Sequence, residues 1–140
     1  MSGYSIEKQV CSLEQAKELA ELLGDDAPES LWCLKKISDP VLGTSIWVLE
    51  LTADQKGVAP FIPAYTGDEL GVFLGNVVDY FLVIYCDVGH DHEFEARMYR
   101  HDQKGDAPSK RNAHEAHAKA ALTIQGLREG WIKREDFRYV

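Results

Sequence analysis

The sequence has 140 residues, of which 45% are hydrophobic, and its formal net charge is −8 at pH 7. A chain of this length suits a single domain, residues 1–140, and buries roughly two-thirds of its unfolded surface, enough for a core without disulfides or metals. No apolar run approaches the roughly 20 residues that cross a bilayer, and the N-terminus lacks the pattern of a signal peptide, so we expect a cytoplasmic protein.

The charge is spread unevenly along the chain. Residues 1–95 carry 17 acidic and 5 basic side chains, whereas residues 96–140 carry 6 acidic and 10 basic ones. The acidic body disfavours general nucleic-acid binding, because neutralisation of phosphates supplies most of that affinity. The basic side chains near the C-terminus are interpreted as the solvated face of a helix, with contact to an anionic partner as the alternative.

The first predicted helix begins after Ser12, because Ser12 and Gln15 have the spacing of a capping box. Gly24 is expected to end this helix. Apolar residues recur between these points at helical spacing and predict one buried face: Leu13, Ala16, Leu19, Ala20 and Leu23.

Two strands are predicted next, over Leu31–Lys36 and Ser45–Leu51. The segment between them contains Asp39, Pro40 and Gly43, which are typical of turns. We therefore expect an antiparallel hairpin whose loop is longer than two residues. Alternation along the second strand places three apolar residues on one face: Trp47, Leu49 and Leu51.

The middle of the chain is expected to be extended around Pro60 and Pro63 and then helical. Thr66 and Glu69 have the spacing of a second capping box. An apolar stripe follows at helical spacing: Leu70, Phe73, Leu74, Val77 and Val78. Tyr80–Cys86 is apolar throughout, which predicts a central strand with both faces covered.

The last third begins with Glu93–His101, where apolar and polar residues alternate and predict an antiparallel strand with one solvated face. Asp102–Lys110 is interpreted as a loop. Asn112 is the predicted cap of the last helix and Gly130 its end, after which Trp131 and Ile132 are expected to fold back onto the body, as is Phe137.

The predicted elements follow in the order α-β-β-α-β-β-α. The simplest arrangement that buries their apolar faces is an α+β, two-layer fold with one four-stranded antiparallel sheet and three helices. Because two strands are apolar on both faces, the second face of this sheet is expected to be covered by the third helix or by another subunit.

Five residues are candidate metal ligands. His90, Asp91 and His92 lie in one turn, and His114 and His117 are three residues apart on a predicted helix, so their side chains share one surface. If the turn met the helix, the imidazoles and the carboxylate would suit a divalent metal. The spacing matches no zinc motif, and the alternative is that the histidines are surface residues.

Other chemistry has weaker support. Asp87, His90 and Asp91 would form an acid–base pair, but no nucleophile elbow, phosphate-binding loop or dinucleotide fingerprint accompanies them. The odd number of cysteines and the absence of Cys-x-x-Cys spacing favour small buried residues in a reducing compartment over a disulfide framework. Cys86 in its apolar strand is expected to have a raised thiol pKa, which disfavours a nucleophilic role.

Aromatic residues on the predicted strands are candidates for a partner surface or for the core, and strand aromatics more often belong to the core. The candidates for an interaction surface are Trp32, Trp47, Tyr65 and Tyr85, and Tyr80 is a further aromatic residue of these strands.

Two segments carry a resemblance: CSLEQAKELAELL (Cys11–Leu23) followed by ESLW (Glu29–Trp32), and PAYTGDELGVFL (Pro63–Leu74). They resemble small uncharacterised bacterial and phage-encoded proteins. A strand pair and an alanine-rich helix that ends in a Gly-Trp-Ile turn complete the resemblance. It implies a bacterial or prophage accessory protein, but it brings no activity, cofactor or catalytic residue.

Together these observations favour a non-enzymatic protein that binds another protein or itself, as a homodimer, through an exposed sheet face. No cofactor is predicted under this hypothesis. The alternative is a metal-binding protein or metal-dependent enzyme that uses His90, His92, His114 and His117. A third hypothesis is an acidic decoy of a DNA-binding protein, which would bind its target more weakly as salt increases.

Overall fold

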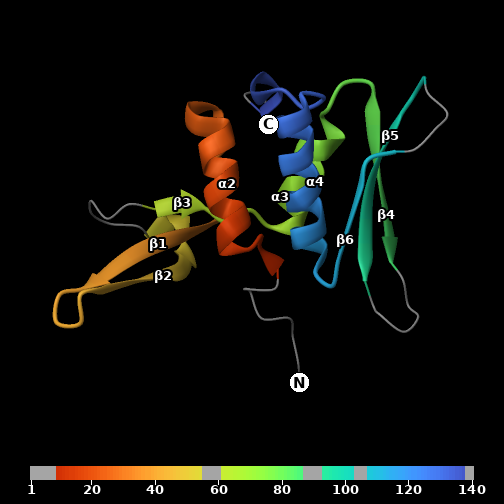
Figure 1. Ribbon diagram of the computed structural model, residues 1–140. Coiled ribbons are helices and arrows are strands. Elements are labelled where there is room, and N and C mark those ends of the chain that lie inside the picture. The colour runs from red at the N-terminus through yellow and green to blue at the C-terminus, as the bar shows by residue number, and fades with distance from the viewer. Residues whose placement is uncertain (1–8, 55–60, 87–92, 103–106, 138–140) are drawn as a thin grey trace.

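The computed structural model describes residues 9–54, 61–86, 93–102 and 107–137. Within them the fold is α+β, with three helices and two three-stranded antiparallel sheets. The helices stand between the two sheets, and the first hairpin projects away from them (Figure 1).

Helix α2 (Leu13–Leu23) begins where the capping box predicts. The Gln15 amide donates to Ser12 Oγ at 3.2 Å, and the Ser12 amide donates to Gln15 Oε1 at 3.0 Å. Three residues of the predicted stripe are buried, namely Ala16, Leu19 and Leu23. The helix passes into a short 3-10 turn, η1 (Gly24–Asp26).

The first sheet contains β1 (Trp32–Asp39), β2 (Thr44–Leu51) and β3 (Phe61–Pro63) in the order β2-β1-β3. The predicted hairpin is confirmed, and its last pair joins Asp39 to Thr44. Gly43 adopts a φ of 67° in the loop, which suits a residue without Cβ. The 3-10 turn η2 (Thr52–Asp54) follows β2.

Helix α3 (Gly67–Gly75) also begins at its predicted capping box, where the Glu69 amide donates to Thr66 Oγ1 at 3.1 Å. The helix ends before the last two residues of the predicted stripe. Val77 is nevertheless buried, whereas Val78 is 70% exposed, so the expectation for Val78 is wrong.

The second sheet contains β4 (Tyr80–Cys86), β5 (Phe94–Arg100) and β6 (Ser109–Asn112) in the order β4-β5-β6. The expectation that Tyr80–Cys86 is a central strand is therefore wrong, because β4 is an edge strand. Its inward side chains pack on the core, but Phe81 and Tyr85 are exposed. The prediction of a loop over Asp102–Lys110 is wrong for Ser109 and Lys110, which are the first two residues of β6.

Helix α4 (Glu115–Glu129) is the longest described helix, and no described helix is long and apolar enough to cross a membrane. It packs against α2, α3, β5 and β6. Its N-cap is His114 rather than Asn112, which instead ends β6 and accepts a hydrogen bond from the His114 amide at 3.0 Å. Because other elements pack against α4 on several sides, its buried residues are not confined to one face of the helix.

The predicted return of the chain after α4 is confirmed. Gly130 adopts a φ of 88°, and the Gly130 and Ile132 amides both donate to the Gly126 carbonyl. A Cβ on Gly126 would lie 2.3 Å from Ile132 Cδ1, so this turn depends on glycine. The 3-10 turn η3 (Arg134–Phe137) then buries Phe137.

The expectation of one four-stranded sheet is wrong. The two predicted hairpins, β1–β2 and β4–β5, do not pair with each other. The second edge of β1 is occupied by β3, and the second edge of β5 by β6, so each hairpin completes its own sheet. Sequence patterns overlooked these third strands because β3 has three residues, one of them a proline, and β6 has no apolar side chain.

Candidate interaction surface on the second sheet

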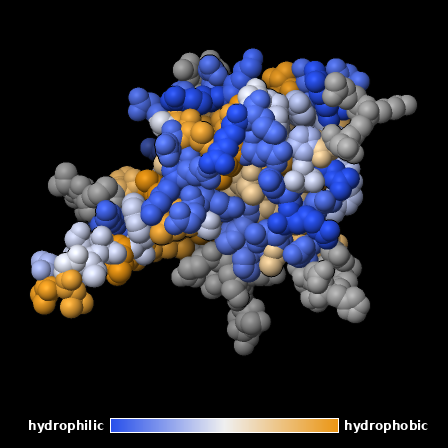
Figure 2. Space-filling view, in the orientation of Figure 1, coloured by the Kyte–Doolittle hydropathy of each residue, from blue (hydrophilic) through white to orange (hydrophobic). Residues whose placement is uncertain are grey.

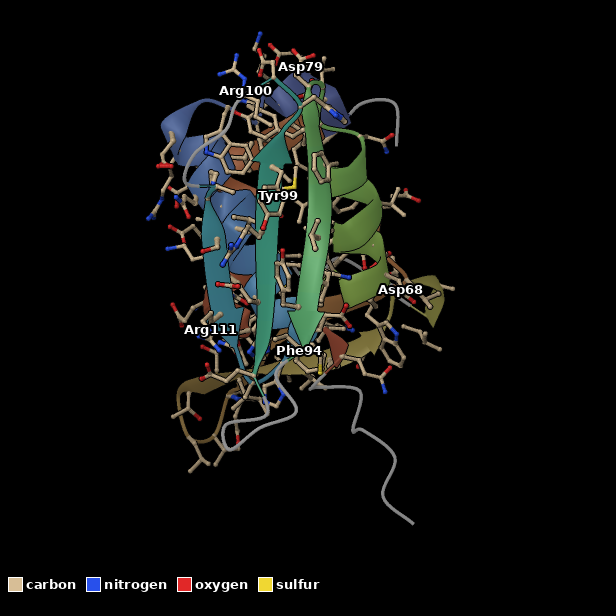
Figure 3. All side chains as sticks on the ribbon, turned by 90° about the vertical axis from the view of Figure 1, so that its right-hand side faces the viewer. Asp68, Asp79, Phe94, Tyr99, Arg100 and Arg111 are labelled. Atoms are coloured by element: carbon tan, nitrogen blue, oxygen red, sulfur yellow. The ribbon has the colours of Figure 1, made fainter. Side chains whose placement is uncertain are left out.

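The second sheet has one covered face and one open face. On β5, Ala96 and Met98 point toward the helices and are fully buried. Successive side chains of a strand alternate between faces, so the intervening residues share the opposite side. We call this side the outer face; it faces the viewer in Figure 3. The register assigns to it Phe81, Val83, Tyr85, Glu95, Arg97, Tyr99, Ser109 and Arg111.

Aromatic rings occupy one end of the outer face. The Phe81 and Tyr99 rings stack across β4 and β5, with centroids 5.4 Å apart and planes inclined by 21°. The centroid of the His101 ring also lies 5.0 Å from that of Phe81. Cross-strand aromatic pairs of this kind contribute roughly 0.2–1 kcal/mol each, so the cluster is an ordered part of the sheet.

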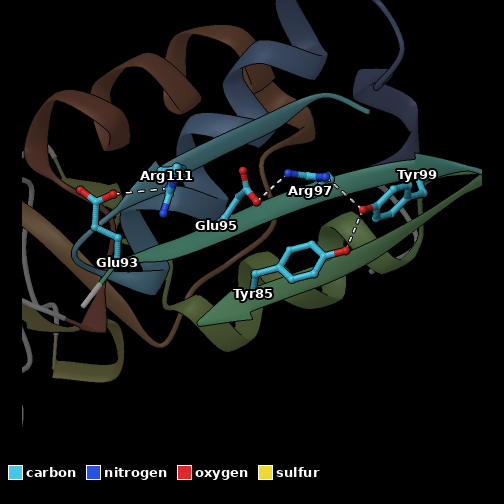
Figure 4. A network of polar contacts seen from close by, with 6 residues as sticks. All are labelled: Tyr85, Glu93, Glu95, Arg97, Tyr99 and Arg111. Carbon is cyan, nitrogen blue, oxygen red and sulfur yellow. Dashed lines mark hydrogen bonds and ion pairs between the residues drawn. The ribbon is translucent and has the colours of Figure 1, made fainter. Parts of the chain in front are cut away.

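A polar network continues from these rings across the strands (Figure 4). The hydroxyl oxygens of Tyr85 and Tyr99 are 2.7 Å apart. Arg97 donates through Nη1 to the Tyr99 hydroxyl at 3.2 Å and through Nη2 to Glu95 Oε1 at 2.7 Å. The Arg97 guanidinium carbon also lies 5.2 Å from the centre of the Tyr85 ring, within cation–π range.

These contacts change the acidity of the two tyrosines in opposite directions. The hydrogen bond between the hydroxyls lowers the pKa of Tyr99, because Tyr85 and Arg97 can both donate to the Tyr99 phenolate. The same hydrogen bond raises the pKa of Tyr85, because donation to the Tyr99 phenolate favours the protonated Tyr85 hydroxyl. The hydrogen bond to Glu95 raises the pKa of Arg97, which therefore stays charged.

Each arginine of the outer face has a carboxylate partner. Arg97 is paired with Glu95, and Arg111 Nε lies 3.4 Å from Glu93 Oε2. Two arginines thus face two glutamates. A surface that binds phosphates needs cations without carboxylate partners, so this arrangement does not suit nucleic acid.

The four residues predicted as an interaction surface lie in different environments. Tyr85 is on the outer face and 44% exposed. Trp32 and Trp47 are partly buried against the core, and Lys17 Nζ of α2 lies 5.4 Å from the Trp47 ring. Tyr65 is only 1% exposed and donates to the Pro28 carbonyl at 2.6 Å, so it belongs to the core.

The predicted metal ligands are placed only in part. His90, Asp91 and His92 lie outside the described residues, as does Asp87. The His114 and His117 rings meet edge to face with centroids 5.0 Å apart, and burial lowers the pKa of His117. Among the described residues, no group of three or more histidine, cysteine, aspartate or glutamate side chains is arranged to hold a metal.

The cysteines only partly match expectation. Cys11 and Cys33 are buried, and burial raises the pKa of the Cys11 thiol to about 12. Cys86 is exposed at the end of β4, so the expectation that it is buried is wrong. Cys86 was expected to be buried because β4 was expected to be a central strand. As an edge strand with an open face, β4 leaves some of its side chains in solvent.

A cleft of about 560 Å³ lies where α3 and α4 begin, and its lining includes Trp32 and His114. Two of its carboxylates, Glu69 and Glu115, already have partners within the protein. Glu69 accepts hydrogen bonds from Ser30, Leu31 and Thr66, and Glu115 pairs with Lys119 at 3.0 Å. Asp68 and His114 also line the cleft.

Sequence patterns identified Tyr85 but missed Phe81, Arg97 and Tyr99 as surface candidates. Alternation along β5 was the available signal, because it assigned Arg97 and Tyr99 to a solvated side. Comparisons with protein-family models, curated proteins and solved structures found no match for this chain. The resemblance to small bacterial and phage-encoded proteins stays a prediction, and function must be inferred from geometry.

Proposed function

We propose that this protein is a non-enzymatic protein-binding module and that the outer face is its contact surface. The observation that supports this most is the cluster of Phe81, Tyr85, Arg97 and Tyr99 on an open sheet face. Tyrosine and arginine are among the residue types that supply most binding energy at protein interfaces.

The shape and charge of the outer face favour a folded protein as the partner. Clefts of about 560 and 620 Å³ have linings that include none of these four residues, so these two clefts lie away from the outer face. The paired charges disfavour nucleic acid. A partner with apolar side chains opposite Phe81 and mixed charges around them would complement this surface.

The network also prepares Arg97 for binding. A guanidinium has five N–H donors, and the described contacts of Arg97 use two of them. The Nε donor is buried, so the two remaining N–H groups on Nη1 and Nη2 are the ones a partner would contact. Contact with two aromatic rings and one carboxylate holds the side chain in place before any partner arrives. Less conformational entropy is then lost on binding, which increases affinity.

The cytoplasmic location and the bacterial or prophage origin belong to the same proposal. The three free cysteines suit a reducing compartment, where thiols are not oxidised to disulfides.

The proposal is tested by capture of partners from bacterial lysate, followed by affinity measurements with the purified partner. Phe81→Ala and Arg97→Ala should each weaken binding by about tenfold or more, as expected for interface residues that supply over 1.4 kcal/mol. Arg128→Ala is the matched control, since it removes an exposed arginine, paired with Glu18, from α4. Unchanged affinity for both outer-face variants, with the fold intact, would refute the proposal.

A further inference from the structure

The free edge of β2 is a second surface without a partner. In the order β2-β1-β3, only one side of β2 is paired among the described residues. Edge strands usually carry lysine, proline or a bulge that prevents pairing with other chains. The eight residues of β2, TSIWVLEL, contain no lysine, arginine, proline or glycine. This edge therefore lacks the usual protection.

The register identifies which backbone groups point off this edge. The Thr52 amide donates to the Leu31 carbonyl at 2.9 Å, which makes this a hydrogen-bonded pair just beyond the two strands. Bonded and non-bonded pairs alternate in an antiparallel ladder, so Ile46, Val48 and Glu50 bond to β1. The amides and carbonyls of the alternate residues of β2 point outward, among them Ser45, Trp47 and Leu49.

The tip of the same hairpin is apolar. Val41 is 88% exposed and Leu42 is 72% exposed. Hydrophobic side chains gather at the far end of the projecting hairpin (Figure 2). Ile46, also exposed, continues this apolar surface along the arm. Packing within the described chain does not explain why these positions are apolar.

We propose that two copies of this chain pair antiparallel through their β2 edges and form one continuous six-stranded sheet. A two-fold axis at Trp47 would place Ser45 opposite Leu49 of the partner copy, so outward-pointing groups meet outward-pointing groups. The only charged residue of β2, Glu50, would then face Thr44 rather than another carboxylate. The strand is thus complementary to itself in hydrogen bonding and in charge.

The same arrangement accounts for the apolar tip. In an antiparallel pair, the loop of one hairpin lies beside the base of the other. Val41 and Leu42 of each copy would therefore reach the body of its partner and lose their exposure to water. One dimer thus explains two independent features, the unprotected edge and the exposed tip, and it does not depend on the outer face of the second sheet.

Amide hydrogen exchange of the full chain, measured by NMR at low and at millimolar concentration, tests this dimer. The Ser45, Trp47 and Leu49 amides should become protected as concentration rises, in step with a change from monomer to dimer by sedimentation. The Ile46, Val48 and Glu50 amides are the internal control, because their bonds to β1 protect them at both concentrations. A monomer whose outward amides stay unprotected at millimolar concentration would overturn the proposal.

A pair of variants tests the edge itself. Ser45→Pro removes an outward amide that has no bond within the sheet, and should weaken dimerisation by about tenfold or more. Ser45→Ala keeps the amide and should dimerise normally, as should Arg97→Ala. A dimer that survives Ser45→Pro, or that needs Arg97, would overturn the proposal. Should Ser45→Pro fail to fold, the exchange pattern of the native chain still decides.

Discussion

The two sheets contain the same number of antiparallel strands but differ in what covers them. Strand β5, FEARMYR, has three charged residues and still includes two fully buried ones, Ala96 and Met98. Strand β2, TSIWVLEL, is far more apolar, yet none of its residues is fully buried. Helix α4 packs directly on β5, whereas the hairpin of β1 and β2 extends beyond the helices. Burial in this protein follows the position of a helix more than the hydrophobicity of a strand.

Truncation of a side chain on each sheet would test this difference most strongly. Met98→Ala should lower the free energy of unfolding by about 2–5 kcal/mol, because it leaves a cavity between β5 and the helices. Ile46→Ala, on the exposed arm, should change it by less than about 0.5 kcal/mol in the monomer. Urea denaturation at low concentration measures both values. Similar losses for the two variants would show that the arm is buried in the monomer.

The hydrogen bonds that join the first sheet to helix α3 should have the next largest effect on stability. The Glu69 carboxylate accepts hydrogen bonds from Ser30 Oγ at 2.7 Å, the Leu31 amide at 3.0 Å and the Thr66 amide at 2.8 Å. It thus links the start of β1 to the start of α3. Glu69→Ala should cost about 1.5–3 kcal/mol in thermal or urea unfolding, because it leaves these donors without their acceptor.

Asp68→Ala is the control for Glu69→Ala. Asp68 is exposed in the same helical turn, so only its favourable interaction with the helix dipole is lost, at about 0.3–1 kcal/mol. Equal losses of unfolding free energy for the two variants would mean that Glu69 acts through the helix dipole and not as a link between the first sheet and α3.

Two glycines should respond to alanine in opposite directions. Gly126→Ala should destabilise the fold by about 1–3 kcal/mol, because the new Cβ would displace Ile132 and the turn that packs on α4. Gly75→Ala meets nothing within 4 Å and should be neutral or stabilise α3 by up to about 1 kcal/mol. Melting temperatures of the two variants would show this. A tolerated Gly126→Ala would indicate that the C-terminal turn contributes little to the cover of the second sheet.

The smallest effect is expected at the outer face. Tyr99 should ionise at a lower pH than Tyr85, because the hydrogen bonds from Tyr85 and Arg97 stabilise its phenolate. A depressed folded pKa of an acid favours the folded state above the unfolded pKa, and this contribution disappears as pH falls through the folded pKa. Absorbance titration should show an early tyrosine transition that Tyr99→Phe removes. An early transition that persists in that variant would contradict the network.

Local features of this fold were predictable. The capping boxes at Ser12 and Thr66 are correct because a side chain and an amide three residues apart meet in any helix that starts there. The hairpin between β1 and β2 and the alternation of β5 also depend on neighbouring residues alone. Of the candidate interaction surface, the sequence indicated only Tyr85 and the solvated side of β5. Which β4 residues lie beside Arg97 and Tyr99 depends on the pairing of β4 with β5.

The sequence by itself determined where α2 and α3 begin, where the first hairpin turns and which side chains of a strand share a face, because these depend on contacts within a few residues. Only the tertiary structure decided that there are two sheets, that β4 is an edge strand and that Tyr85 of β4 meets Arg97 of β5. The physical reason is that an apolar strand buries its faces only where another element can cover them. Here the position of α4, set by residues from α2, α3 and the second sheet, determines which face is covered.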